Sequence, residues 1–397
     1  MLFAKLNDLS IGGKGAYGIA ASAVERKADL PTYLRITDIF DDGTLNLSEL
    51  KSVDAPNSDK YILKPNDIVF ARTGGSTGRN YFYDGSDGVF VYAGFLIKFS
   101  IDPEKVNPKY VKYYCRSKQY NDWVQSFNTG STRGNINAQT FGNMEIPLLE
   151  RKQQDYLVSI LEPIDEKIKN NKQVNDNLQQ QAAALFESWF VNYDPWDGVQ
   201  PSEWENAPLG SFVEIKRGGS PRPIQDFLSD SGLRWLKISD VTSLSSPFVL
   251  EIKEHIKEEG LRKTVFLHAG ELVLSNSATP GIPKILDVDT CIHDGWLYFP
   301  KSELSKYYLY LFFKHIRKEL VALGNGSVFT NLKTDILKAF PATKADESTL
   351  KEFDALVTPL FDAMLNADRE NFKLAAMRDA LLPKLMSSEI DVSEVEL

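Results

Sequence analysis

The stretch Tyr33-Leu34-Arg35-Ile36-Thr37-Asp38-Ile39 recurs later in the chain as Trp235-Leu236-Lys237-Ile238-Ser239-Asp240-Val241, at an offset of 202 residues. Aromatic residues match aromatic residues in the two stretches, and basic residues match basic ones. Four further matches keep the same order at nearby offsets: Asp67–Phe70 with Glu271–Leu274, Gly94-Phe95-Leu96 with Gly295-Trp296-Leu297, Gly130-Ser131 with Gly326-Ser327, and Ile146-Pro147 with Phe340-Pro341. Offsets that drift while the order is kept are typical of a duplication followed by insertions in loops. The chain is therefore predicted to contain two related domains.

The first part of each copy mixes short alternating runs with turns rich in Gly, Pro, Ser and Asn. Runs at 33–39, 67–72 and 89–99 alternate as half-buried strands do. One helix is expected near Pro108–Lys118, and its counterpart near Ser305–Leu320. This pattern predicts an α+β protein with two mixed α/β domains.

The second part of each copy has apolar residues spaced alternately four and three positions apart, which is the pattern of a coiled-coil seam. It predicts a helix from about residue 150 to residue 192, roughly 65 Å long at about 1.5 Å per residue, and an equivalent helix 196 residues later. The two predicted seams are Leu157, Leu161, Ile164, Ile168, Asn171, Asn175, Leu178, Ala182, Leu185 and Trp189, and Phe353, Val357, Leu360, Met364, Ala367, Asn371, Leu374, Arg378, Leu381 and Leu385. A helix lying on its own domain also shows an apolar stripe, but the length and the shared heptad favour pairing of the two helices.

Two pairs of equivalent residues refine this prediction. Pro163 and Pro359 occupy one repeat position, and a proline inside a helix removes a hydrogen bond, so we expect a short segment before each proline and a long helix after it. Asn175 and Asn371 are equivalent and lie near the middle of the seam. Equivalent residues meet only near the centre of an antiparallel pair, so the two asparagines are expected to bond to each other and fix the register. The helices are then antiparallel, about a pseudo-two-fold axis.

The expected division of the chain is residues 1–148 for the first domain, 149–194 for the first helix, 195–344 for a proline-containing linker and the second domain, and 345–397 for the last helix. The net charge of −9 is not spread evenly over these parts. Residues 1–148 carry +1, 149–204 carry −5, 205–344 carry +2 and 345–397 carry −7. The acidity lies in the helices, so the two domains remain candidates for binding nucleic acid.

The sequence shows no catalytic motif. Gly74-Gly75-Ser76-Thr77-Gly78 lacks the Gly-Lys-Ser/Thr ending of a phosphate loop. Asn107-Pro108-Lys109-Tyr110 resembles the Asn-Pro-Pro-Tyr element of adenine methyltransferases, but a helix cap followed by proline explains it better. The four histidines and two cysteines show no metal-ligand spacing. No apolar run is long enough to span a membrane, and no secretion signal is recognised, so a cytoplasmic protein is expected.

Polar, basic and glycine-containing loops recur at matching places in the two domains. Arg, Asn, Ser and Thr side chains read base edges or hold phosphates, whereas an ordinary solvated turn has a similar composition. The loops differ most where Arg72-Thr73 matches Asn276-Ser277, as expected of loops that read different bases. The candidate DNA contacts are Lys14, Tyr17, Arg72, Thr73, Ser76, Thr77, Arg79, Asn80, Arg133 and Asn135 in the first domain and Lys216, Arg217, Arg222, Ser275, Asn276, Ser277, Thr279, Asn331 and Lys333 in the second.

Several stretches resemble the specificity subunit of type I restriction–modification systems, over essentially the whole chain. Leu185-Phe186-Glu187-Ser188-Trp189-Phe190-Val191 is similar to the end of that family's central helix, and residues 377–390 are similar to the end of its C-terminal helix, with Ser388 where Gly is more usual. Residues 209–221 resemble the opening of the family's target-recognition domain. The first domain's opening at residues 11–15 departs from that form.

The resemblance implies a non-catalytic subunit whose two target-recognition domains each read one half of an asymmetric bipartite site in double-stranded DNA. It also implies that the helices set the gap between the halves and bind two methyltransferase subunits, which restriction and translocase subunits join. S-adenosylmethionine and ATP would be bound by those partners, and no cofactor by this chain. The alternatives are a subunit of a methylation-only system, a protein-binding scaffold built on a coiled coil, and a self-contained methyltransferase.

Overall fold

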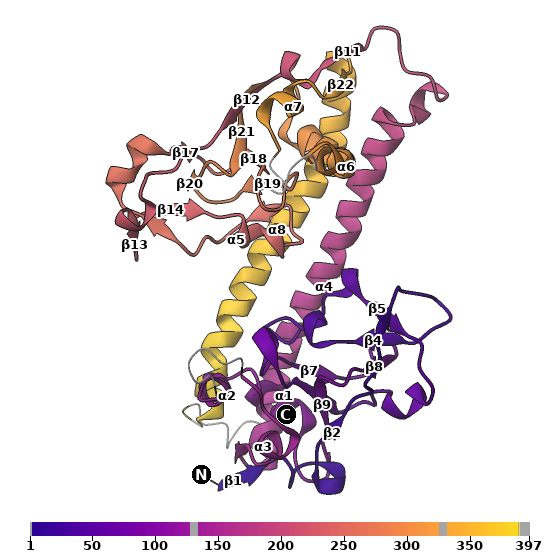
Figure 1. The fold of residues 1–397 in the computed structure, drawn as a ribbon, viewed down its shortest axis with the longest axis vertical. Helices are drawn as coiled ribbons and strands as arrows, with labels where there is room; N and C mark the ends of the chain where they lie inside the picture. The colour runs from indigo at the N-terminus through magenta and orange to yellow at the C-terminus, as the bar shows by residue number, and fades with distance from the viewer. Residues whose placement is uncertain (1, 128–133, 325–331, 388, 390–397) are drawn as a thin grey trace. The chain divides into compact units, whose positions relative to one another are not determined.

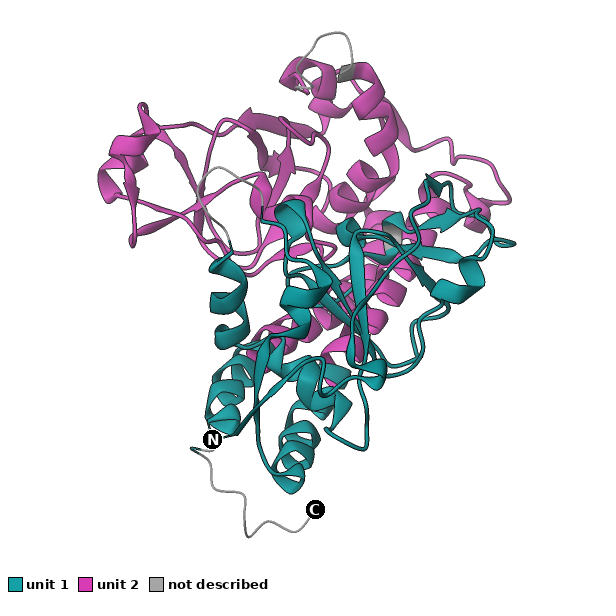
Figure 2. Cartoon of the chain, turned by 60° about the horizontal axis from the view of Figure 1, so that its bottom comes forward, with its two compact units in different colours: residues 1–166, 375–397 teal, residues 167–374 magenta. Residues whose placement is uncertain are grey.

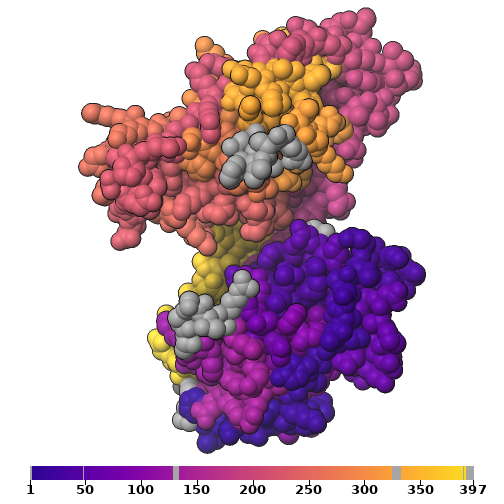
Figure 3. Space-filling model, in the orientation of Figure 1, coloured from indigo at the N-terminus to yellow at the C-terminus, as the bar shows by residue number. Residues whose placement is uncertain are grey.

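The computed structural model describes residues 2–127, 134–324, 332–387 and 389 (Figure 1). The chain divides into two compact units, residues 1–166 with 375–397 (unit 1) and residues 167–374 (unit 2), which are coloured separately in Figure 2. Two 40-residue helices, α4 (Arg151–Phe190) and α8 (Glu347–Met386), each contribute to both units. In the space-filling view, most of the visible surface of unit 1 belongs to the segments before residue 150 (Figure 3).

The described residues of unit 1 form three antiparallel or mixed sheets and three short α-helices, besides its parts of α4 and α8. The sheets have the strand orders β1-β10, β2-β9-β6-β7 and β3-β5-β4-β8. The strands are β1 (Leu2–Lys5), β2 (Ala16–Tyr17), β3 (Ala23–Val24), β4 (Thr32–Leu34), β5 (Lys51–Val53), β6 (Asp67–Ala71), β7 (Asn80–Tyr83), β8 (Phe90–Tyr92), β9 (Leu96–Ser100) and β10 (Glu145–Leu148), and the helices are α1 (Pro108–Tyr114), α2 (Lys118–Gln125) and α3 (Ala138–Gly142). Of the predicted strands, the run at 67–72 corresponds to β6, and the run at 89–99 forms two strands, β8 and β9. The run at 33–39 is a strand only as far as Leu34 and continues as a 3-10 helix at Ile36–Asp38, while α1 lies within the predicted helix.

Unit 2 repeats this plan with longer sheets. Their strand orders are β11-β22, β12-β21-β18-β19-β15 and β13-β16-β14-β20-β17. The strands are β11 (Glu205–Pro208), β12 (Val213–Arg217), β13 (Leu228–Ser229), β14 (Leu233–Leu236), β15 (Phe248–Val249), β16 (His255–Ile256), β17 (Val265–Leu267), β18 (Leu272–Ser275), β19 (Pro283–Leu286), β20 (Thr290–Ile292), β21 (Trp296–Ser302) and β22 (Pro341–Lys344), and the helices are α5 (Ser239–Thr242), α6 (Lys306–Gly324) and α7 (Thr334–Lys338).

Hydrogen bonds fix which residues of the two units are equivalent. Leu6 N–H donates to the carbonyl of Met144, and Leu209 N–H donates to that of Phe340. The sequence match of Ile146-Pro147 with Phe340-Pro341 is therefore wrong by two residues, because Met144 is the structural counterpart of Phe340. A short Ile-Pro or Phe-Pro dipeptide is too weak a pattern to hold the register.

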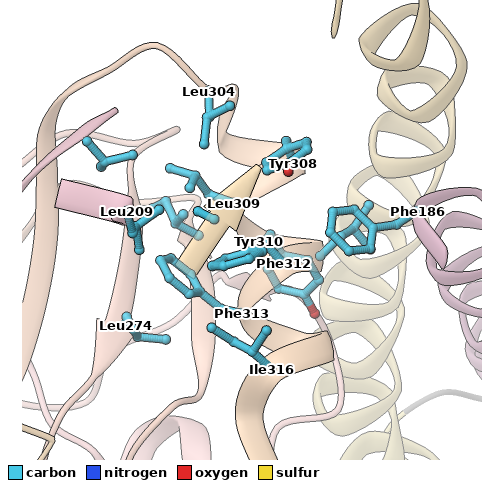
Figure 4. Close-up of a cluster of buried hydrophobic side chains, with 14 of the residues drawn as sticks. Phe186, Leu209, Leu274, Leu304, Tyr308, Leu309, Tyr310, Phe312, Phe313 and Ile316 are labelled. Atoms are coloured by element: carbon cyan, nitrogen blue, oxygen red, sulfur yellow. The ribbon is translucent and has the colours of Figure 1, made fainter. Parts of the chain in front are cut away.

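Each unit buries the ends of the two long helices in its own core. In unit 2, Phe186 and Phe190 of α4 contact Phe353 of α8, with ring centroids 6.3 and 4.8 Å apart, and join the cluster around Tyr308 shown in Figure 4. In unit 1, Leu157 and Leu161 of α4 share a cluster with Leu382 and Leu385 of α8. Burial of each such side chain stabilises the folded state by about 1.5–3 kcal/mol. The helix ends and the domain of each unit therefore share one hydrophobic core.

The prolines do not divide the helices, which corrects the prediction made from Pro163 and Pro359. Both residues lie inside uninterrupted 40-residue helices. Both are exposed, so the carbonyl that each leaves without a partner can be hydrated. Buried residues two positions away, Leu161 before Pro163 and Phe361 after Pro359, hold each helix in the core.

The predicted seam faces inward along both helices, since none of its 20 residues is exposed. In unit 2, Asn171 donates to the side-chain oxygen of Asn371 (2.9 Å), and Asn175 donates to Asp368 (2.8 Å) and to the carbonyl of Met364 (3.2 Å). Higher numbers on α4 thus meet lower numbers on α8, as far as Phe190 with Phe353. The asparagines are correctly placed, but the bond between Asn175 and Asn371 is wrong, because Asn371 pairs with the residue one turn earlier.

In unit 1 the helix pair is held by an ion cluster around the carboxylate of Asp165. Lys112 of α1 and Arg116, just after α1, lie 3.1 and 2.8 Å from it, and Arg378 of α8 lies 3.1 Å from it. Burial alone would raise the pKa of Asp165, but these three cations lower it to about 2. At the matching place in unit 2 stands Phe361, whose ring lies 5.4 Å from that of Tyr310. The two ends of the helix pair are therefore fixed by different chemistry.

Candidate nucleic-acid interface

Three neighbouring strands of the four-stranded sheet in unit 1, β2, β9 and β6, have their ends side by side. Tyr17 pairs with Ile97, which also pairs with Phe70. Beyond this row, Arg72 N–H donates to the carbonyl of Phe95 (3.1 Å), and Ile136 N–H donates to the carbonyl of Arg72 (2.9 Å). We call the backbone at Arg72, Phe95 and Ile136 the strand-end frame of unit 1.

Arg72 is held on this frame by aromatic rings. Its guanidinium carbon lies 5.2 Å from the ring centre of Tyr17 and 5.9 Å from that of Phe95. The two rings are 43% and 56% exposed, and the Tyr17 hydroxyl accepts from the N–H of Ala138 (3.1 Å), which opens α3. An arginine over aromatic faces keeps its charge while its planar fork is oriented. Phe95 was not among the predicted contacts, because a single aromatic residue after a glycine does not indicate exposure.

Unit 2 contains the same frame with other side chains. Asn276 N–H donates to the carbonyl of Gly295 (2.9 Å), and Leu332 N–H donates to the carbonyl of Asn276 (2.7 Å). Arg217 pairs with Leu297, which also pairs with Leu274. Arg72 therefore corresponds to Asn276, as predicted.

The same bonds overturn the predicted match of Gly94-Phe95-Leu96 with Gly295-Trp296-Leu297. Phe95 corresponds to Gly295, one residue earlier, so the large apolar residue that follows is Leu96 in one unit and Trp296 in the other. The sequence comparison aligned two aromatic residues that face different directions. Gly18 and Gly218 are equivalent on this evidence, since they donate to the carbonyls of Leu96 and Trp296. A β-carbon at either would overlap a neighbouring carbonyl oxygen, so both positions need glycine.

Asp294 organises the polar side chains of unit 2's frame. Arg217 Nε donates to its carbonyl oxygen, Arg222 lies 3.2 Å from its carboxylate, and the Ser220 hydroxyl donates to that carboxylate (2.7 Å). The Ser220 hydrogen bond, together with the two arginines, lowers the pKa of Asp294. Burial lowers the pKa of His293, which accepts from Gly295 N–H through Nδ1 (2.7 Å). Asp294 was not among the predicted contacts, because an acidic residue is not an expected feature of a DNA-binding surface.

Three of the predicted contacts, Asn80, Ser275 and Asn276, are buried and contact the backbone of the loops instead. Asn80 is 7% exposed and donates to the carbonyl of Cys115 (2.9 Å) at the end of α1. Ser275 is fully buried, donates to the carbonyl of Thr279 (2.6 Å) and accepts from Ile282 N–H (2.8 Å). Their side chains are not available to DNA, because β-strand ends that look like loops in the sequence are covered by the chain that follows.

The other candidates remain at or near the surface. Arg79 pairs with Asp41 (2.7 Å), and Lys216 pairs with Glu214 (2.9 Å), while the Thr77 hydroxyl lies 2.8 Å from the carbonyl oxygens of Gly74 and Gly134. Thr73 pairs with Asn135 in an isolated bridge. Exposed or partly exposed are also Lys14, Ser76, Ser277, Thr279 and Lys333. Arg133 and Asn331 lie outside the described residues.

Among the described residues, no group of three or more His, Cys, Asp or Glu side chains is arranged to hold a metal ion. The described helices include none that is long and apolar enough to cross a membrane.

Comparison with known proteins identifies the class of protein that this repeated frame belongs to. The sequence model of the type I restriction modification DNA specificity domain matches residues 25–180 and again residues 201–343. The two matches cover most of the chain, which therefore belongs to this family and carries two copies of its domain.

Two curated relatives are specificity subunits of type I restriction enzymes. The MjaIX subunit of Methanocaldococcus jannaschii is 24% identical over 314 residues, which are 74% of this chain and 72% of that protein. The HindI subunit of Haemophilus influenzae is 22% identical over 450 aligned residues, covering 92% of this chain and 97% of that protein. The crystal structure of the S subunit of a type I system from M. genitalium matches with a TM-score of 0.58 and 16% identity, over 97% of this chain and 95% of that one, and so shares the fold.

Proposed function

We propose that this chain is the DNA-specificity subunit of a type I restriction–modification complex and is itself non-catalytic. One observation supports this most strongly: the two units share a strand-end frame, bond for bond, while the side chains mounted on it differ. Two domains that share a backbone frame but present different polar side chains can read two different DNA sequences, because base edges are read by side chains. Each target-recognition domain, residues 1–148 and 195–344, then reads one half of an asymmetric bipartite site.

The helices at residues 149–194 and 345–397 are proposed to form an antiparallel coiled coil that relates the two domains by a pseudo-two-fold axis. The contacts of Asn171 and Asn175 in unit 2 and of Asp165 in unit 1 support this arrangement, since in each unit rising numbers on α4 meet falling numbers on α8. The helical segments also carry the chain's acidity, which disfavours them as DNA contacts. They are therefore proposed to set the gap between the half-sites and to bind two methyltransferase subunits, which restriction subunits join, in the cytoplasm.

The proposal is tested with the full chain reconstituted with its methyltransferase partner. The complex, supplied with S-adenosylmethionine and a library of random duplexes, is expected to modify one asymmetric bipartite motif, and mapping the modified bases reports it. The chain alone is expected to modify nothing. A complex without sequence preference, or a chain that methylates by itself, would overturn the proposal.

A further inference from the structure

The two units place an arginine on the same face of their equivalent sheets, but from different strands. Side chains two residues apart on a strand share a face, and so do directly paired residues of antiparallel neighbours. In unit 1 this face carries Tyr17 at the end of β2 and Arg72 after β6. In unit 2 the matching positions hold Arg217, at the end of β12, and Asn276, after β18. The arginine of unit 2 therefore lies on the strand that carries Tyr17 in unit 1.

Neither arginine is a freely moving charge. Arg72 has Tyr17 and Phe95 as its ring neighbours, and its Nε is buried without a hydrogen-bond partner. Within the described part of the chain no carboxylate forms an ion pair with Arg72. Arg217 is instead fixed by Asp294, through the carbonyl oxygen and a carboxylate 4.0 Å away, and about half of its side chain stays exposed. Both guanidinium groups are oriented before any ligand arrives.

Asn276, which matches Arg72, is enclosed rather than presented. It is 3% exposed, and its Nδ2 lies 3.4 Å from the carbonyl oxygen of Asp294. Its Oδ1 has no partner within the described structure. In unit 2 this position therefore supports the frame, and Arg217 takes the exposed place.

We infer that Arg72 and Arg217 are the base-reading residues of the two domains, each donating two hydrogen bonds from its guanidinium group to the O6 and N7 acceptors of a guanine in its half-site. This rests on the proposed function and deepens it. A phosphate contact needs positive charge but no fixed orientation, and Asp294 would weaken it by cancelling that charge. Fixed orientation matters for a bidentate contact with a base edge, where arginine–guanine pairs are the commonest specific contact. Tyr17 and Asp294 are the positioning residues.

Substitution by lysine separates the two kinds of contact, because lysine keeps the charge and loses the fork. The full-length variants Arg72→Lys and Arg217→Lys are reconstituted with the methyltransferase partner and assayed on random duplexes. Each is expected to lower the preference for guanine at one position by roughly 5- to 150-fold. Arg72→Lys should affect only one half of the motif and Arg217→Lys only the other. The salt dependence of binding should stay as in the wild type.

A second pair of variants tests the positioning residues. Tyr17→Leu should relax the same base position as Arg72→Lys, and Asp294→Asn the same position as Arg217→Lys, which a merely structural role would not produce. A relaxed motif itself requires a folded, active complex, so loss of folding is not mistaken for the expected result. If the lysine variants retain the full motif, the inference is wrong while the proposed function stands. If the wild-type complex has no bipartite motif, the proposed function fails.

Discussion

Replacing Asp165 by asparagine should destabilise unit 1 far more than the loss of a surface charge would. The carboxylate is 14% exposed and faces Arg116, Lys112 and Arg378, which are each 16–17% exposed. Asparagine keeps the shape but leaves these three cations together in a partly buried place. Leaving buried charge without its partner costs about 3–5 kcal/mol.

The shifted pKa gives an independent magnitude and a sign. Asp165 has its pKa lowered from 3.8 to about 2 in the folded chain. A depressed acidic pKa stabilises the fold above the unfolded value and loses that contribution as the pH falls toward the folded value. One pKa unit is worth about 1.4 kcal/mol, so the shift alone corresponds to about 2–3 kcal/mol. Together the two arguments predict a loss of about 3 kcal/mol at pH 7, shrinking as the pH falls from about 4 to about 2.

Urea unfolding of the wild type and of Asp165→Asn, repeated across this pH range, measures the effect. Asp379→Asn is the matched control, because Asp379 also bonds Arg378 (2.8 Å) but is 66% exposed. An exposed pair of this kind contributes about 0.2–1 kcal/mol. The reasoning is refuted if Asp165→Asn costs no more than Asp379→Asn, or if its cost does not change with pH.

Three further predictions concern the helices and the core of unit 2. Burial lowers the pKa of Lys284 to about 7, so the unfolded chain binds the Lys284 proton more tightly than the folded chain does. The free energy of unfolding should therefore rise from pH 7 to about 10.5, by at most about 1.4 kcal/mol per pH unit. Lys284→Met should remove that rise when unfolding is measured across this pH range. Pro163→Ala should stabilise the chain by about 1–3 kcal/mol in chemical denaturation, because it restores a hydrogen bond inside a continuous helix, and an unchanged midpoint would count against this. Asn171→Ala should cost about 1–2 kcal/mol in thermal unfolding by leaving the side-chain oxygen of Asn371 without its donor, and a stabilised variant would show that the asparagine pair is not needed.

The sequence was sufficient for the large features, because these depend on periodicity. The heptad spacing correctly predicted both long helices and the inward-facing seam, including Asn171 and Asn175. It did not predict the continuity of the helices past Pro163 and Pro359. Packing on both sides of an exposed proline decides that outcome, and packing involves residues distant in the chain.

The candidate site was predictable in position but not in detail. The match of Arg72 with Asn276 is confirmed by the hydrogen bonds of the frame, since backbone patterns survive duplication. The sequence does not show that Asn276 is buried while an arginine on the neighbouring strand is exposed. That arginine is Arg217, which corresponds to Tyr17 in the first unit. Asp294 was not predicted, because an acidic residue is not expected on a DNA-binding surface and its partners Arg217 and Arg222 are distant in the sequence.

The central claim is that the two domains read separate halves of one site about a pseudo-two-fold axis. The most direct measurement uses a variant in which a second copy of residues 2–148 replaces residues 205–344. Ala182→Arg and Phe361→Asp are added, because these positions match Arg378 and Asp165 of the ion cluster in unit 1. The bases modified by the reconstituted complex are then mapped. The account predicts that the asymmetric motif becomes an inverted repeat of the half read by the first domain. An unchanged asymmetric motif, or a direct repeat of one half, would contradict it.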